Sequence, residues 1–195
     1  LVGTQMLSKG HHFPGVTLVV AADGDLGLNL PDYRSAERSF HLLVQVAGRA
    51  GRGERPGEVL IQTRNPDLPF WKHVLNQDYE AFYAEEIEKR RRFGYPPFTR
   101  LGLLRLSHKA DWTRGAEAVG VLAGAIRTAA GELGVTALGP AQAPLALLRG
   151  RRRFHCLLKA PDWPSVRGVF DAAQRANPDP RRLALSLDLD PVQML

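Results

Sequence analysis

Residues 16–22 read Val16-Thr17-Leu18-Val19-Val20-Ala21-Ala22, and this near-continuous apolar run decides the fold class of the first half of the chain. A strand buried on both faces of a parallel sheet has this β-branched composition, whereas a half-solvated strand alternates. Residues 57–63 predict another short strand after a Gly/Pro turn. Between the two strands, residues 35–47 have helical spacing, and their apolar stripe is Phe40, Leu43, Val44 and Ala47. This alternation predicts an α/β fold with a parallel sheet.

The first half should end in helix. Residues 69–92 suit one long helix or two short ones, with candidate packing positions Phe70, Val74, Leu75, Tyr79, Phe82, Tyr83 and Ile87. The helix should end before Gly94-Tyr95-Pro96-Pro97, because proline lacks a backbone donor and disfavours helix in the residue before it. We therefore predict a first domain over residues 1–66, a helical linker over 67–95 and a second domain over 96–195.

The second domain is predicted to be a small α+β sandwich with its helices on one face. Its expected strands cover residues 99–106, 134–139, 145–149, 153–159 and 182–188, and its expected helices cover 113–132 and 163–176.

Composition limits the function classes. The chain has 195 residues, no apolar run of the roughly 18–20 residues needed to span a membrane, and no signal-peptide pattern at its start. Its single cysteine, Cys156, excludes an internal disulfide and a cysteine-based zinc cage within the chain, which fits a reducing, cytoplasmic location. Residues 1–95 hold 12 basic and 12 acidic side chains, whereas residues 96–195 hold 14 and 8. The basic second half suits a polyphosphate partner, although charge alone leaves a solvated basic surface equally open.

Two motifs carry recognisable chemistry. The first is Gln45-Val46-Ala47-Gly48-Arg49-Ala50-Gly51-Arg52, where two arginines three residues apart are separated by small residues. Nucleotide-driven motors use such arginines because a guanidinium group neutralises the charge that spreads over the γ-phosphate during hydrolysis. The alternative is a helix that ends in ordinary surface arginines. The second motif, residues 3–14, is a polar, glycine-containing loop between two strands, which can offer a hydroxyl and backbone N–H groups to phosphates.

These motifs resemble motifs VI and V of superfamily 2 helicases. In a combination of segments, the chain is similar to the bacterial primosomal replication-restart helicases, the PriA family. These segments are Gly3-Thr4-Gln5-Met6 to Pro14, Asp23-Gly24-Asp25, Asp32-Tyr33-Arg34, the arginine motif, residues 91–98 and Asp188-Leu189-Asp190-Pro191. The resemblance covers essentially the whole chain. It implies the C-terminal part of a RecA-like helicase lobe followed by a DNA-contacting domain.

The resemblance also implies function. Its members are ATP-driven 3′→5′ DNA helicases that recognise abandoned forks, bind single-stranded DNA-binding protein and, with other primosome proteins, help to reload the replicative helicase. Members act in the cytoplasm, on the nucleoid, and need ATP and Mg²⁺.

Site residues follow from the motif matches. Arg49 and Arg52 match the γ-phosphate-sensing arginines, and Gln45 matches the residue that couples them to DNA and nucleotide. The DNA-facing positions of the loop are Thr4, Gln5 and Lys9, and its nucleotide-facing positions are Gly10 and His12. His12 stands where many related motors have an acid that holds a ribose hydroxyl, which puts that contact in doubt.

Some expected motor parts are missing from the sequence. It contains no phosphate loop of the form G-x-x-x-x-G-K-[ST] and no acidic Mg²⁺ motif, so we expect the chain alone to hydrolyse no ATP. The family's zinc module would precede Leu1. His11 and His12 are interpreted as plain loop residues rather than metal ligands, because no partner set accompanies them.

Three basic clusters are candidate DNA contacts. Lys89-Arg90-Arg91-Arg92 follows Glu85, Glu86 and Glu88, which favours pairing within the helix. Arg149, Arg151, Arg152 and Arg153 surround a glycine without a nearby acid, which favours phosphate binding. Arg181-Arg182 stays open between the two interpretations. The tryptophans Trp71, Trp112 and Trp163 are interpreted as packing residues rather than base-stacking platforms.

Two other function classes compete with the motor. A non-catalytic restart scaffold would bind fork DNA and partner proteins without hydrolysing ATP, and an intact phosphate loop elsewhere in the full gene would argue against it. A free-standing nucleic-acid-binding domain is disfavoured because residues 1–4 look like the end of a strand whose beginning is missing.

Overall fold

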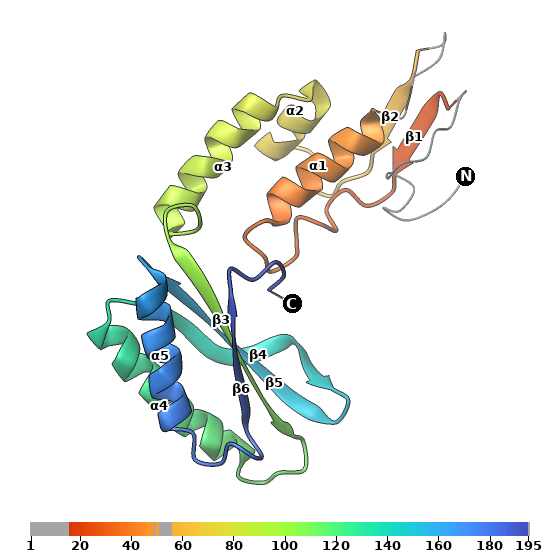
Figure 1. Ribbon diagram of the computed structural model, residues 1–195. Coiled ribbons are helices and arrows are strands. Elements are labelled where there is room, and N and C mark those ends of the chain that lie inside the picture. Colours follow the sequence, from red (N-terminus) through yellow and green to blue (C-terminus); the bar gives the residue numbers. More distant parts are fainter. Residues whose placement is uncertain (1–15, 49, 51–55, 195) are drawn as a thin grey trace. The chain divides into compact units, whose positions relative to one another are not determined.

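The computed structural model describes residues 16–48, 50 and 56–194 (Figure 1). The chain divides into two compact units, Leu1–Ile87 and Glu88–Leu195, and the division falls within a helix. In chain order the elements are β1 (Leu18–Ala21), α1 (Ser35–Ala47), β2 (Glu58–Ile61), α2 (Pro69–Asn76), α3 (Tyr79–Phe93), β3 (Arg100–Lys109), α4 (Gly115–Glu132), β4 (Thr136–Leu148), β5 (Arg151–Ala160), α5 (Trp163–Arg175) and β6 (Ala184–Leu189).

In the first unit, β1 and β2 pair in parallel, as the strand–helix–strand pattern predicts. Helix α1 buries Phe40 and Leu43. The ring of Phe40 stacks on that of Phe82 in α3, with 4.4 Å between the centroids. Trp71 and Val74 of α2 complete the buried cluster. The α/β prediction is therefore confirmed as a parallel pair of strands with packed helices.

The prediction that residues 16–22 are buried on both faces is wrong for this chain. Along β1, exposed and half-buried side chains alternate, and the same alternation follows β2. Leu18 and Val20 are 51% and 57% exposed, and Leu60, opposite Val20, is 49% exposed. Within the described residues only one face of this sheet is covered, because α1 packs against the side that carries Ala21 and Ile61.

The helical segment over residues 69–92 forms two helices, α2 and α3, and α3 ends at Phe93, before the Gly-Tyr-Pro-Pro sequence. Val74 and Phe82 are buried as predicted. Leu75, Tyr79 and Tyr83 are not, because these candidate packing positions lie on the outward sides of two short helices rather than along one stripe.

The second unit is one four-stranded antiparallel sheet with strand order β4-β5-β3-β6. The chain order β-α-β-β-α-β with this strand order is a split β-α-β topology. Helices α4 and α5 lie side by side on one face of the sheet (Figure 1). The prediction of an α+β sandwich with helices on one face is confirmed.

The core of this unit lies between the helices and the alternate strand residues that point toward them. Leu104 and Leu106 of β3, Cys156 and Leu158 of β5, and Ile126 of α4 are each at most 1% exposed. The remaining buried members of this core are Ala118, Val119, Leu122, Ala129, Ala130, Val135, Ala160, Val166, Val169, Ala173 and Leu183. Residues at the odd positions of β3 and β5 therefore lie on the face opposite α4 and α5, which we call the helix-free face, and Leu101 and Leu103 are buried on that face.

One strand differs from the prediction. Residues 134–139 and 145–149 were expected to form separate strands, but β4 runs unbroken from Thr136 to Leu148. Its register against β5 shifts between Leu138 and Ala141 and again between Gln142 and Leu147. Pro140 and Pro144 lie within these two register shifts of an edge strand, where a missing N–H interrupts little of the ladder. No helix in the described part of the chain is long and apolar enough to cross a membrane.

Candidate nucleic-acid interface

The predicted nucleotide-binding and DNA-binding residues of the first unit lie almost entirely outside the described residues. Thr4, Gln5, Lys9, Gly10 and His12 belong to the undescribed N-terminal segment, and their placement stays a prediction. The same holds for Arg49 and Arg52. Gln45 is described, and it is exposed on the last turn of α1. Helix α1 ends at Ala47 with Gly48 as its C-cap, so the two arginines follow the end of the helix.

Asp25 and Asp32, two acids of the family-like sequence segments, accept hydrogen bonds from nearby residues of the first unit. Asp25 is 3% exposed and accepts hydrogen bonds from Thr63 Oγ1 (2.8 Å) and from the Arg64 N–H (2.7 Å). The Arg64 N–H and then the Thr63 hydroxyl hold the pKa of Asp25 below its usual range. Asp32 accepts from the Arg34 N–H at 2.9 Å and pairs with Arg38 at 3.0 Å. These contacts fix the segments after β1 and β2.

The arginine cluster of the second unit lies at the end of the β4–β5 hairpin. The turn consists of Arg149 and Gly150, and both have positive φ angles, 50° and 71°. Two such residues between paired strands form a type I′ turn, whose twist matches that of the flanking strands. Arg149 is exposed at this turn. The hairpin therefore presents a cation at its tip even though the left-handed region is uncommon for a residue with a Cβ atom.

The structure separates the other three arginines. Arg151 donates from Nη2 to the Ser107 carbonyl oxygen (2.8 Å) and from Nε to Ser107 Oγ (3.2 Å). Arg152 is exposed, and Arg153 is half-buried. Neither guanidinium group has a hydrogen bond or ion pair within the part of the chain that the structure describes. Strand alternation places Arg151 and Arg153 on the helix-free face and Arg152 on the opposite face. The four arginines thus do not form one patch.

Sequence reasoning missed the basic residues that the sheet register brings beside this cluster. On the helix-free face, Arg105 lies opposite His155, and Lys109 lies opposite Arg151. Arg105 pairs with Asp188 at 2.7 Å and donates to the Gln193 carbonyl oxygen at 3.3 Å. Lys109 is exposed. The alternate positions of Arg105 and Lys109 along β3 were the available signal, but they become informative only once β3 is known to pair with β5.

The pKa of His155 is lowered within the basic strip of the helix-free face, which consists of Arg105, Lys109, Arg151 and Arg153. Burial is the largest cause of its lowered pKa, and the nearby guanidinium groups of Arg153 and Arg105 lower the pKa further. A phosphate bound beside these arginines would oppose their effect, because a nearby anion favours the protonated imidazole.

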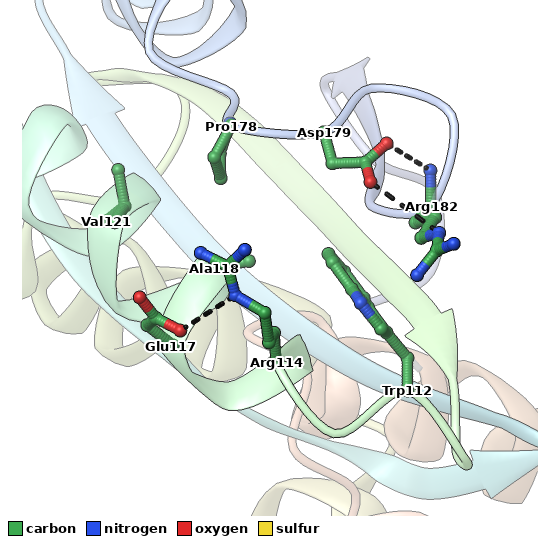
Figure 2. Close-up of a pocket in the computed structure, with 8 residues that line it drawn as sticks. All are labelled: Trp112, Arg114, Glu117, Ala118, Val121, Pro178, Asp179 and Arg182. Atoms are coloured by element: carbon green, nitrogen blue, oxygen red, sulfur yellow. Dashed lines mark hydrogen bonds and ion pairs between the residues drawn. The ribbon is translucent and has the colours of Figure 1, made fainter.

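The two other basic clusters have acidic partners. In α3, Arg91 forms an ion pair with Glu88, which confirms pairing within the helix for that residue. In the loop before β6, Arg182 lies 3.7 Å from the Asp179 carboxylate, whereas Arg181 is exposed. Figure 2 shows Arg182 in a pocket with a second paired cation, Arg114, which donates to Glu117 at 3.2 Å. The remaining lining residues are Trp112, Ala118, Val121, Pro178 and Asp179.

The tryptophans and the cysteine pack in the cores. Trp71 is buried and donates from Nε1 to the Asn65 carbonyl oxygen at 2.8 Å, and Trp112 and Trp163 pack against the core of the second unit. The prediction that they are packing residues is confirmed. Burial raises the pKa of Cys156 to about 12, so its thiol is inert at neutral pH. The described residues include no group of histidine, cysteine and acidic side chains suited to a metal ion.

The second unit is thus a small split β-α-β domain with a basic hairpin and a basic strip on its sheet. The sequence pattern of the primosomal protein N C-terminal domain matches residues 91–192, which is more than half of the chain.

Relatives extend this likeness over the first unit. Replication restart protein PriA of Treponema pallidum is 42% identical over 195 residues, covering 100% of this chain and 29% of that protein. The PriA proteins of Bacillus subtilis and Synechocystis are 35% and 38% identical over 198 and 196 residues, which are 24% and 23% of their lengths. The chain therefore belongs to the PriA family of replication restart proteins. It spans about a quarter of the length of these relatives.

Proposed function

We propose that this chain is the C-terminal part of an ATP-dependent 3′→5′ DNA helicase that recognises stalled or abandoned replication forks. The full-length protein would restart replication by promoting reloading of the replicative helicase. The observation that supports the proposal is the relationship to replication restart protein PriA across the whole chain. The proposed partners are branched and single-stranded DNA, single-stranded DNA-binding protein, other primosome proteins and the helicase-loading system, with action in the cytoplasm, on the nucleoid.

Within this proposal, residues 1–66 are the end of a RecA-like helicase lobe, residues 67–95 are a helical linker and residues 96–195 are the DNA-binding domain. Gln45, Arg49 and Arg52 would face the nucleotide in the closed motor, with Gly10 and His12 on the opposing loop. ATP and Mg²⁺ would supply the free energy for strand separation in the full-length protein, and its zinc module would lie outside this chain.

DNA contact is assigned to Thr4, Gln5 and Lys9 of the N-terminal loop and to the exposed arginines of the β4–β5 hairpin, Arg149 and Arg152, because Arg151 is held by Ser107 and Arg153 is half-buried. The hairpin supports this assignment through its charge. No aspartate or glutamate occurs between Glu132 and Asp162, a segment that contains Arg149, Arg151, Arg152 and Arg153. Cations without neighbouring acids gain most from phosphate contacts, which release condensed counterions.

ATPase measurements test the motor. In the full-length protein, Arg49→Ala or Arg52→Ala should lower the DNA-stimulated kcat about 10³-fold, if these arginines stabilise the γ-phosphate charge as arginine fingers do. The 195-residue chain alone should show no ATPase activity above a contaminant-controlled background. Near-normal turnover in both variants would remove these arginines from the site, and a full-length protein without any DNA-stimulated ATPase would favour the scaffold.

A further inference from the structure

The end of the β4–β5 hairpin combines its arginines with exposed leucines. Leu145, Leu147 and Leu148 of β4 are 59%, 63% and 45% exposed. A single exposed leucine is ordinary on a protein surface. Three of them lie within four residues of a tip that also carries arginines, so this tip is both apolar and cationic. The tip projects away from α4 and α5, so neither helix covers it (Figure 1).

The strand register pairs the two kinds of side chain. Leu147 lies opposite Arg152, and Leu148 lies opposite Arg151. Directly opposed residues of antiparallel strands share a face, with Cβ atoms about 4.5–5.5 Å apart. Arg151 is already held by Ser107, so the side of the tip with Leu148 is partly committed to the domain itself. The side with Leu147 and Arg152 is exposed, and Arg149 adds a cation at the turn.

This surface specifies the chemistry of its partner. The absence of acids between Glu132 and Asp162 favours an anionic partner, and the leucines require an apolar surface within a few ångströms of its negative charges. DNA offers both, as phosphates and as the faces of its bases. Within an uninterrupted duplex, stacking covers the base faces. They become accessible at a branch point or where a step opens, and proteins that enter such steps use leucine and other apolar side chains.

We propose that the hairpin tip recognises the branch point of forked DNA by placing Leu145 and Leu147 against the exposed face of the terminal base pair. Arg149 and Arg152 bind the phosphates of the strands that diverge there. The arginines supply affinity for any DNA, and the leucines supply the preference for a branch. This inference rests on the proposed function and assigns part of its fork recognition to named side chains.

The test compares two DNA substrates and two kinds of variant in the full-length protein. The substrates are a fork and an uninterrupted duplex of equal length, and binding is measured by fluorescence anisotropy. Leu145→Thr with Leu147→Thr removes apolar surface but keeps residues that favour strands. Val121→Thr is the matched control, because Val121 is an apolar residue of similar exposure (48%) on α4, away from the hairpin. Arg149→Ala with Arg152→Ala tests the phosphate contacts.

The double leucine variant should bind the fork about tenfold more weakly, equivalent to about 1.4 kcal/mol. Its affinity for the duplex and the salt dependence of binding should not change. Leu147→Phe should keep or increase the fork preference, because an aromatic ring stacks on a base. Val121→Thr should leave both affinities unchanged.

Other outcomes overturn the inference in distinguishable ways. An unchanged fork preference in the double leucine variant, or an equal loss on fork and duplex, would refute the branch contact and leave the proposed function intact. A lowered melting temperature of the DNA-free variant would show that the leucines pack against another part of the full-length protein, which also refutes it. If the double arginine variant binds both DNAs normally, the hairpin is not a DNA contact, and the proposed assignment of these arginines fails with it.

Discussion

The arginines at the hairpin end should separate in a salt titration, because the structure gives them different partners. The guanidinium group of Arg151 donates hydrogen bonds of 2.8 and 3.2 Å to Ser107, whereas Arg152 on the opposite face is exposed. We therefore expect Arg152→Ala to weaken DNA binding and Arg151→Ala to weaken the fold. The sequence alone, which shows only a cluster of arginines, predicts equal effects for the Arg151→Ala and Arg152→Ala variants.

The magnitudes follow from one phosphate contact and from two hydrogen bonds. Each neutralised phosphate contributes about 0.9 to the slope of log K against log salt, so Arg152→Ala should flatten the slope by about 0.9. Over a fourfold rise in salt, that contact accounts for a change in affinity of about 3.5-fold. Arg151→Ala should leave the slope within error but lower the free energy of unfolding by about 2 kcal/mol, because each of its two hydrogen bonds contributes about 1 kcal/mol net.

Both quantities can be measured on the same preparations. Anisotropy with a labelled fork, from about 50 to 200 mM salt, gives the slope. Urea denaturation gives the free energy of unfolding. Arg127→Ala is the control, because Arg127 is exposed on α4, away from the hairpin. Equal slope changes for Arg151→Ala and Arg152→Ala would refute the division of the cluster, and an unchanged slope for Arg152→Ala would remove that residue from the interface.

Three further predictions concern the fold. Gly115→Ala should lower the urea midpoint, because a Cβ atom there would overlap the buried ring of His108; an unchanged midpoint would show that the ring can move aside. Cys156 should resist alkylation at pH 8 in the native protein and react once the protein is unfolded, since its pKa is raised to about 12; rapid native labelling would contradict its burial. The lowered pKa of Asp25 means that its contribution to stability is complete above about pH 4, the usual value for aspartate, and is lost as pH falls through the lower folded pKa. Asp25→Asn should therefore make stability less sensitive to pH below about 4, and an unaltered acid limb of the stability curve would exclude that contribution.

The sequence predicted the helices best. Residues 35–47 were expected to be helical and form α1 with those bounds, and residues 163–176 correspond to α5, Trp163–Arg175. Helical periodicity and caps act within a few residues, so they can be read locally. The burial of β1 could not be read in this way, because it depends on which elements pack against each face of the sheet.

Strand β4 shows a second limit of local reading. Gly139-Pro140 and Pro144 carry turn chemistry, and the sequence pattern therefore divides residues 134–149 into two strands. Whether a proline interrupts a strand depends on the strand's position in the sheet, because only a central strand needs both rows of backbone hydrogen bonds. The position of β4 at the edge is fixed by the pairing of β3 with β5 and β6, which are distant in sequence.

The same distinction limits what the sequence of the hairpin arginines, Arg149 to Arg153, could predict about binding. Four arginines in five residues have the same charge and the same neighbours in the sequence, so composition assigns them one role. Pairing with β3 gives Arg151 an internal partner, and pleating sends Arg152 to the opposite face, beside Leu147. Affinity and specificity can therefore reside in adjacent residues of one strand. If so, a substitution scan along β5 should alternate in its effect on salt dependence with a period of two residues, a pattern that an unstructured basic loop would not produce.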